Sequence, residues 1–482
     1  MTTLLAITLS ALAVREAIAE QEAQAAKLHA GVAAVDVSPT QFPLNMPGGF
    51  RGNLAEKNYD PFHSRAIVLS DGETTIAMVV VDNLGVEPEV IQSAKEIAAE
   101  ETGIPTEKMM VSSTHTHSGP SSGGGNEREK AYQQQLREGI AESIVQAHED
   151  LQPAALGAAS HPLPDEVFNR RWYLKPGRMP LNPFGEMDIV KMNPPRSPDV
   201  LDRPAGPTDP DVSVISIEKA NGRPLGLFAN YSLHYVGAIP RGQMSADYFG
   251  EFARLMPVRL RAGEDFVAMM SNGTSGDINN IPFGVTRPPR EPFEQVSIVA
   301  RKTADAAWFA VEKIDRYQRD LTIDMREREI TLRHRRPSPA LLKRAKEILE
   351  MKDPEQIEKL PRLAQIYARR TVRMAELPSD TVTVKLQAIR IGDIAICAIP
   401  FETFVEIGLD LKDRSPMEQT IVVGLANGRY GYLPTPRQHR LGGYETWLGT
   451  NKVQKDASEI LVRNLMEMLE EVSGVGRVKS EG

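Results

Sequence analysis

The sequence predicts one large α/β domain, because strand and helix patterns alternate through most of its 482 residues. Two pairs of apolar runs flank short glycine-containing turns, as in β-hairpins, and no shift in composition marks a linker. We therefore expect a single mixed α/β domain over residues 30–475. Residues 1–29 are a separate N-terminal segment in this prediction, and residues 338–376 are a helical insertion within the domain.

The first half of the predicted domain alternates strands with helices. Residues 75–82 are almost continuously apolar, which is typical of a strand buried on both faces. Gly103 and Pro105 stop one helical pattern, and Pro153 stops a longer one. We expect strands at 65–70, 75–82 and 108–113 and helices at 89–101 and 127–151.

The second half contains both hairpins and two amphipathic helices. The turns at Asn221-Gly222 and Gly392-Asp393 join strands expected at 212–218 and 225–233, and at 381–391 and 394–399. A further strand is expected at 266–271, and helices at 297–314 and 454–472. The charged residues 338–376 carry no catalytic residue types, so we expect them to form a solvated surface.

Composition excludes several classes of function. The formal net charge of −8 is spread over many residues without a basic tract, which argues against a nucleic-acid partner. Cys397 is the single cysteine, so neither an intrachain disulfide nor a cysteine metal cluster can form. It lies in an apolar run and is expected to be a buried structural thiol.

The N-terminus has some features of an export signal. Residues 4–14 are apolar, and Ala17-Ile18-Ala19 matches a small-x-small cleavage site, although no Lys or Arg precedes the apolar stretch. We expect a secreted or periplasmic protein, with a cytoplasmic location as the alternative. Neither this stretch nor any later one is long enough to span a bilayer, so any membrane contact would be transient and at the surface.

Two of the nine histidines, His115 and His117, lie in one loop after a predicted strand. An extended His-x-His segment places both imidazoles on one side of the backbone, because side chains alternate with a period of two. Imidazole is the commonest metal ligand, so this pair is a candidate half-site. The alternative is a pair of hydrogen-bonded loop histidines.

A tetrahedral zinc site needs further nitrogen or oxygen ligands from elsewhere in the chain. His234 and Glu402 each follow an apolar strand. A carboxylate at the end of a buried strand is unfavourable unless it is paired or bound to a metal. A structural role for His234 and a surface position for Glu402 are the alternatives, and Tyr444 has no distinguishing feature in isolation.

Together these segments resemble the neutral, non-lysosomal ceramidases, zinc enzymes that hydrolyse the N-acyl bond of sphingolipids. The matching segments occur in order between residue 31 and about residue 450. They are "GVAAVDVSPT", "THTHSGP", "FNRRW", "FANYSLH", "NGTSGDINN", "PFETF" and "VVGLANGRYGYLPT…GGYET". The histidine loop and the last block are the most specific.

The resemblance implies a zinc cofactor and a role for each matching residue. The zinc ligands it implies are His115, His234, Glu402 and Tyr444. It places His117 beside the scissile group as a proton-transfer or polarising residue, and it gives the Asn169-Arg170 pair contact with substrate. Asp277 belongs to the glycine-aspartate turn that borders the site.

The chain departs from the family pattern at two places. The family has a serine three residues after the glycine of "GDVSPN", and this chain has Asn279 there. An amide side chain exchanges hydrogen bonds but cannot form an acyl-enzyme. The chain also ends after its last predicted helix, so we expect no counterpart of the family's C-terminal β-sandwich.

These observations favour a zinc-dependent hydrolase of a small-molecule or lipid N-acyl substrate, or of a related acyl bond. Direct attack by zinc-bound water needs no serine, and His117 and Asn279 would move a proton and hold the oxyanion. The alternatives are a non-catalytic lipid- or glycan-binding module and a metallophosphoesterase, although the aspartate motifs of a two-metal centre are absent. A conventional serine hydrolase is disfavoured, because "NGTSGD" is not a Gly-x-Ser-x-Gly elbow.

Overall fold

The computed structural model describes residues 27–49 and 53–474. The predicted export segment, residues 4–19, lies outside these ranges, so export stays a prediction. Within the described ranges, none of the helices is both long and apolar enough to cross a membrane.

An eight-stranded sheet forms the centre of the molecule, and its strand order differs from chain order. Most neighbouring strands are antiparallel, while the β14–β16 and β6–β7 pairs at its two edges are parallel. In spatial order its strands are β16 (Val267–Asn272), β14 (Pro224–Tyr231), β13 (Asp211–Lys219), β8 (Gln152–Pro162), β1 (His29–Asp36), β5 (His63–Ser70), β6 (Thr75–Val81) and β7 (Met109–Ser113).

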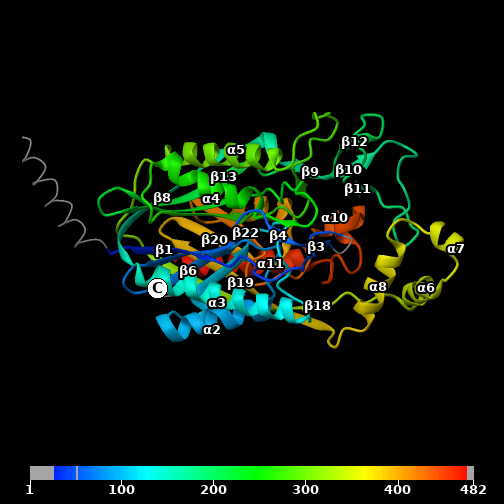
Figure 1. Cartoon of the computed structure of the whole chain (residues 1–482), viewed down its shortest axis with the longest axis horizontal. Coiled ribbons are helices and arrows are strands. Elements are labelled where there is room, and N and C mark those ends of the chain that lie inside the picture. The colour runs from blue at the N-terminus through cyan, green and yellow to red at the C-terminus, as the bar shows by residue number, and fades with distance from the viewer. Residues whose placement is uncertain (1–26, 50–52, 475–482) are drawn as a thin grey trace, which may run out of the picture.

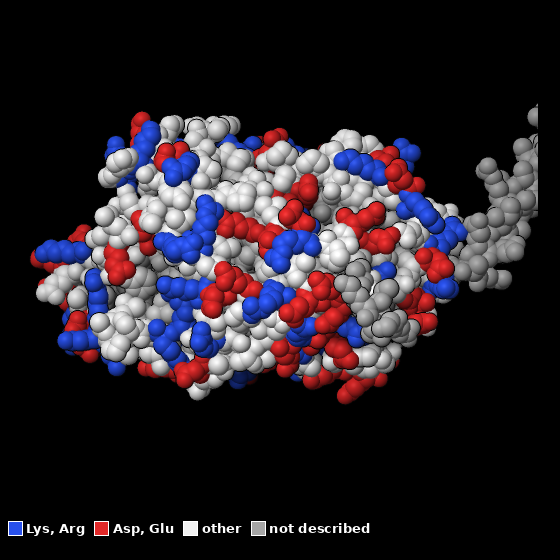
Figure 2. All heavy atoms as spheres, turned by 180° about the vertical axis from the view of Figure 1, so that it is seen from behind, with Lys and Arg blue, Asp and Glu red and all other residues white. Residues whose placement is uncertain are grey.

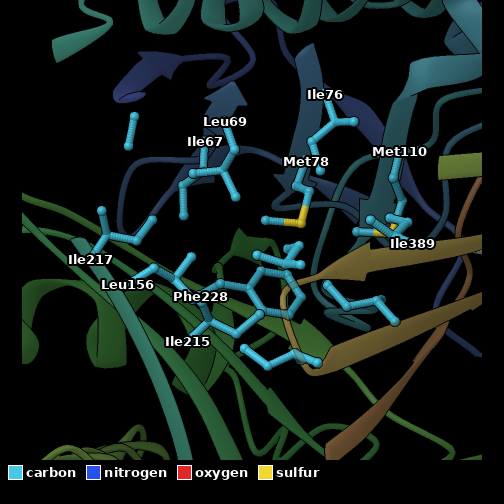
Figure 3. Packing of buried hydrophobic residues seen from close by; sticks show 14 of the residues in the cluster. Ile67, Leu69, Ile76, Met78, Met110, Leu156, Ile215, Ile217, Phe228 and Ile389 are labelled. Atoms are coloured by element: carbon cyan, nitrogen blue, oxygen red, sulfur yellow. The ribbon is translucent and has the colours of Figure 1, made fainter. Parts of the chain in front are cut away.

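A second sheet of four strands packs against the inner face of the first. Its strands, in spatial order, are β18 (Ile323–Arg333), β19 (Thr381–Ile391), β20 (Ile394–Ile399) and β22 (Gln419–Gly424). The core between the sheets is apolar: Ile67, Met78, Ile215 and Phe228 of the large sheet and Ile389 of the small one are all fully buried (Figure 3). Burying these side chains is the main force that holds the two sheets together.

Helices cover the outer faces of the sheets, and Figure 1 shows α4 and α5 along one side of the molecule and α2 and α3 along the other. On the large sheet, α2 and α3 cover one half and α4 and α5 cover the other, while α9 and α11 cover the small sheet. Their bounds are α2 (Pro88–Thr102), α3 (Glu127–Glu149), α4 (Asp247–Leu260), α5 (Glu294–Val311), α9 (Val405–Arg414) and α11 (Ala457–Ser473). The predicted mixed α/β class is confirmed.

The predicted insertion is helical and contains α6 (Pro339–Glu350), α7 (Pro354–Glu358) and α8 (Ala364–Ala375). These helices lie at one end of the molecule, beyond the two sheets (Figure 1). Ala345 and Ile348 of α6 pack on Ala368 of α8 in a small apolar cluster of their own. The opposite side of α8 is not simply solvated as the sequence suggested, because Tyr367 is fully buried against the main body.

The large sheet curves until its two edge strands approach each other. β7 and β16 contact each other, and both contact β22 of the small sheet. The side-chain amide of Asn272, the last residue of β16, donates hydrogen bonds to the backbone oxygens of Thr114, Leu233 and His234. The loops after β7, β14 and β16 therefore meet at one point, although they are far apart in the sequence.

Candidate metal centre

Three imidazoles converge where these strands end. His115 and His117 follow β7, and His234 follows β14. The Nε2 atom of His115 lies 3.0 Å from Nε2 of His234 and 3.2 Å from Nε2 of His117. All three donor atoms lie within 4.8 Å of one another, so the group has the geometry of a metal site.

Each imidazole is oriented by a backbone carbonyl on its other nitrogen. The Nδ1 atoms of His115, His234 and His117 contact the oxygens of Leu84 at 2.5 Å, Ser275 at 2.9 Å and Gly48 at 3.1 Å, respectively. A neutral ring whose proton is on Nδ1 presents an unprotonated Nε2, which is the arrangement of a metal-binding histidine. Lone pairs that face each other at about 3 Å repel unless a cation lies between them.

Burial disfavours the charged form of His117 and His234. Desolvation and, next, the charge of His115 lower the pKa values of His117 and His234 well below the ordinary 6.5. His115 has a backbone φ of 69°, a left-handed conformation that is unfavourable for a non-glycine residue. Strained backbone of this kind gathers at functional sites, where the surrounding structure fixes one orientation.

Glu402 supplies a carboxylate oxygen to the same point. It lies in the short strand β21 (Glu402–Thr403), just after β20. Its Oε2 is 3.2 Å from His115 Nε2 and 3.6 Å from His234 Nε2. This oxygen is buried and accepts no hydrogen bond in the described part of the chain. A bound cation would satisfy both the oxygen and the facing nitrogens, so the residues fit a zinc ion.

Two tyrosines complete the surroundings. Tyr432, in β23 (Tyr432–Leu433), pairs with Glu402 in a parallel bridge, and the rings of Tyr432 and Tyr444 lie 5.6 Å apart. Burial, and next the charge of Glu402, raises the pKa of Tyr444 to about 12. Both tyrosines therefore carry protonated phenols unless a cation draws the proton away. Tyr432 did not stand out in the sequence, although it lies in the motif block that carries the resemblance.

His115, His117 and Glu402 line a cavity of about 750 Å³, whereas His234 is not part of its lining. His117 is half-buried on its wall and stacks on Tyr235 with ring centroids 3.7 Å apart, whereas His115 and His234 are buried. The lining also includes Tyr432 and Tyr444. His115 and His117 both line this cavity, and His117 is the more exposed of the two.

Arg170 also reaches the cavity, through a buried ionic network. Its Nε lies 2.8 Å from Glu445 Oε1, and Arg171 Nη1 lies 2.5 Å from Glu445 Oε2. The guanidinium of Arg170 also donates to the oxygen of Gly276 and lies 5.4 Å from the Tyr432 ring centroid. This network ties the "FNRRW" segment to the segment that carries Tyr444.

Asn169, Asp277 and Asn279 lie behind the cavity wall rather than on it. Asp277 accepts hydrogen bonds from Asn169 Nδ2 and from the backbone nitrogen of Val405, and burial raises its pKa to about 6. Asn279 donates to Asn193 Oδ1 at 2.6 Å, and Asn193 lines the cavity. The structure therefore places these three predicted residues where they support the wall, and their predicted catalytic and binding roles stay predictions.

The turn that contains Asp277 is tightly packed. A Cβ atom at Gly276 would lie 2.5 Å from the backbone oxygen of Glu402, so only glycine fits there. The backbone nitrogen of Gly276 donates to Thr403 O at 2.8 Å. The glycine-aspartate turn thus fixes the strand that carries the candidate ligand Glu402.

Only the comparison with solved structures, among those made with known proteins, bears on the fold. No family model and no curated protein matches this sequence. Among solved structures, neutral ceramidase from Pseudomonas aeruginosa matches with a TM-score of 0.69 and 16% identity, over 93% of this chain and 75% of that chain. A structure of ceramidase complexed with C2 matches with a TM-score of 0.70 and 16% identity, over 93% and 76% of the two chains. The chain therefore has a neutral-ceramidase-like fold, as the motifs predicted.

Proposed function

We propose that the protein is a zinc-dependent hydrolase of an N-acyl amide or a related acyl bond. The convergence of three imidazole Nε2 atoms and the buried Glu402 oxygen beside a cavity carries this proposal. The ceramidase-like fold supports it, since a neutral ceramidase shares the arrangement of the chain. His115, His234, Glu402 and Tyr444 would hold the ion.

A zinc ion in this position would polarise the scissile carbonyl and lower the pKa of a water molecule to about 7. The side chains would carry out the remaining proton transfers. His117 faces the cavity with a neutral ring, so its Nε2 takes a proton from the attacking water and gives it to the leaving nitrogen. Water is the nucleophile, because Asn279 replaces the family serine and offers no hydroxyl.

A panel of substrates tests the proposal. Zinc-loaded protein should release the fatty acid from N-acyl amides, N-acyl amino acids or short acyl esters, and a chelator should abolish this activity. Phosphate monoesters and diesters in the same panel test for a metallophosphoesterase. Turnover of the phosphate esters alone, or of no compound despite full zinc occupancy, would overturn the proposal and favour a phosphoesterase or a binding module, respectively.

A further inference from the structure

The lining of the cavity is rich in cations, although the chain as a whole has a net charge of −8. The described lining residues include Arg170, Arg370, Arg373, Arg429 and Lys452, and their single carboxylate is Glu402. Arg370 and Arg373 belong to α8 of the insertion. On the face shown in Figure 2, by contrast, acidic and basic side chains are interspersed.

Two of these cations already have carboxylate partners, and three do not. Arg170 pairs with Glu445, and Arg429 Nη2 lies 2.9 Å from Glu87 Oε1. In residues 27–49 and 53–474, the side chains of Arg373 and Lys452 have neither an ion pair nor a hydrogen bond. Arg370 contacts hydroxyls only. The pKa of Lys452 is lowered, first by desolvation and then by Arg429, while the charges of Glu87 and Glu402 act in the opposite direction.

Arg370 is held in place with part of its guanidinium free. Its Nη1 donates to the Thr450 hydroxyl at 3.0 Å and to the Tyr367 hydroxyl at 3.2 Å, and the guanidinium lies 5.0 Å from the Tyr367 ring centroid. No described residue accepts a hydrogen bond from its Nε or Nη2. A fixed guanidinium with two unused donor nitrogens is suited to a carboxylate or phosphate, which it binds through parallel hydrogen bonds.

We propose that the cavity selects acyl substrates that carry an anionic group, a carboxylate or a phosphate, and that Arg370, Arg373 and Lys452 bind that group while the acyl bond lies at the histidines. This inference rests on the proposed hydrolase function and names its substrate class. A neutral head group would leave the three cations without a partner. An anion gains attraction from all three, of which Arg370 is half-buried and Arg373 and Lys452 are exposed.

Three dodecanoyl compounds of similar size test the inference. N-dodecanoylglycine carries a carboxylate, N-dodecanoyl-phosphoethanolamine carries a phosphate and N-dodecanoylethanolamine is neutral. The full-length, zinc-loaded protein should show a kcat/KM for one or both anionic compounds that is about tenfold or more above that for the neutral compound. The two anionic arms show which group is preferred.

Reversal of a charge on α8 tests whether the cationic lining residues cause the preference for anionic compounds. In Arg373→Glu the ratio of anionic to neutral kcat/KM should fall about tenfold, at unchanged zinc content. Lys346→Glu, the same reversal of charge on α6 of the same insertion but outside the lining of this cavity, should keep the wild-type ratio. Equal rates on the three compounds, or a preference that persists in Arg373→Glu, would overturn the inference, the latter because it would indicate direct binding of the anion to zinc.

Calorimetric binding of the same compounds separates this inference from the proposed function. If no compound is hydrolysed, yet the anionic ones bind more tightly than the neutral one and Arg373→Glu removes the difference, the hydrolase proposal fails and the anion site holds. If hydrolysis occurs without any effect of substrate charge on rate or binding, the hydrolase proposal holds and the anion site is wrong.

Discussion

His115, His117 and His234 are oriented by backbone carbonyls rather than by the side chains of other residues. A carbonyl that belongs to the fold holds each Nδ1, so the ring can rotate only if the backbone moves. The three histidines differ in exposure. His115 and His234 are buried and His117 is half-buried, although His115 and His117 both line the cavity. The proposed function assigns His115 and His234 as ligands and His117 as the residue that acts on substrate.

Zinc content separates these roles. Replacement of a ligand removes the ion, so His115→Ala and His234→Ala should lose most of the one zinc expected per chain and all activity. His117→Ala should keep its zinc and lose about 100- to 10,000-fold in rate, because it lacks the proton-transfer group. Elemental analysis and kcat measure the two effects, and His161→Ala in β8 is the matched control. Loss of zinc in His117→Ala would instead place His117 among the ligands.

Asn279 does not line the cavity itself but contacts a residue that does. Its amide holds Asn193, whose side chain reaches the lining, so Asn279 is a positioning residue in this structure. Asn279→Ala should lower kcat/KM about tenfold, less than the roughly 100- to 1000-fold loss on removal of a direct oxyanion-hole donor, because Asn279 acts through Asn193. Because the two residues act as a pair, the double variant with Asn193→Ala should be little worse than either single variant. Additive losses would show that Asn279 contacts substrate itself.

At the scale of elements, the site is built where strands end. β7, β14, β20 and the β21–β23 pair each deliver one or two side chains, and the loops between them are joined by polar contacts rather than by an apolar core. The strongest of these contacts is the carboxylate of Glu445, which bridges Arg170 and Arg171 in a fully buried setting.

Removal of that carboxylate should destabilise the protein strongly. Glu445→Gln leaves two buried guanidinium groups without their counter-charge, which costs about 3–5 kcal/mol in the free energy of unfolding. Asp410→Asn removes the exposed pair with Arg414 in α9 and should cost less than about 1 kcal/mol. Chemical denaturation of both variants gives the comparison. Similar small losses in the two would mean that the buried network does not hold these loops together.

Individual elements were readable from the sequence because their local patterns were strong. The hairpin over 381–391 and 394–399 occurs at the predicted residues, and most other predicted elements end within three residues of their predicted bounds. His115, His234 and Glu402 were candidates because each follows a predicted strand, but only the family resemblance grouped them as ligands, and that role stays a prediction. Arg370 and Arg373 were missed, because charged residues on an amphipathic helix look the same whether they face solvent or a cavity.

At the scale of the whole molecule, the sequence could not show how the layers stack. Strands buried on both faces carry no pattern that tells which face meets the second sheet and which meets a helix. The curvature that brings β7 and β16 together follows from packing across the entire core, so the meeting of the histidine loops was expected from the family resemblance and not from the strand pattern. The fold positions the candidate ligands, and the proposed chemistry depends on the zinc ion that they would hold.

A zinc titration of metal-free protein is the most direct test of that dependence. Release of fatty acid from an N-acyl substrate should rise in proportion to bound zinc and reach a plateau at about one zinc per chain, and His234→Ala should show neither binding nor activity at any zinc concentration. Hydrolysis that is complete without metal, or tight zinc binding that is unchanged in His234→Ala, would contradict the assignment of this cluster as the catalytic metal centre.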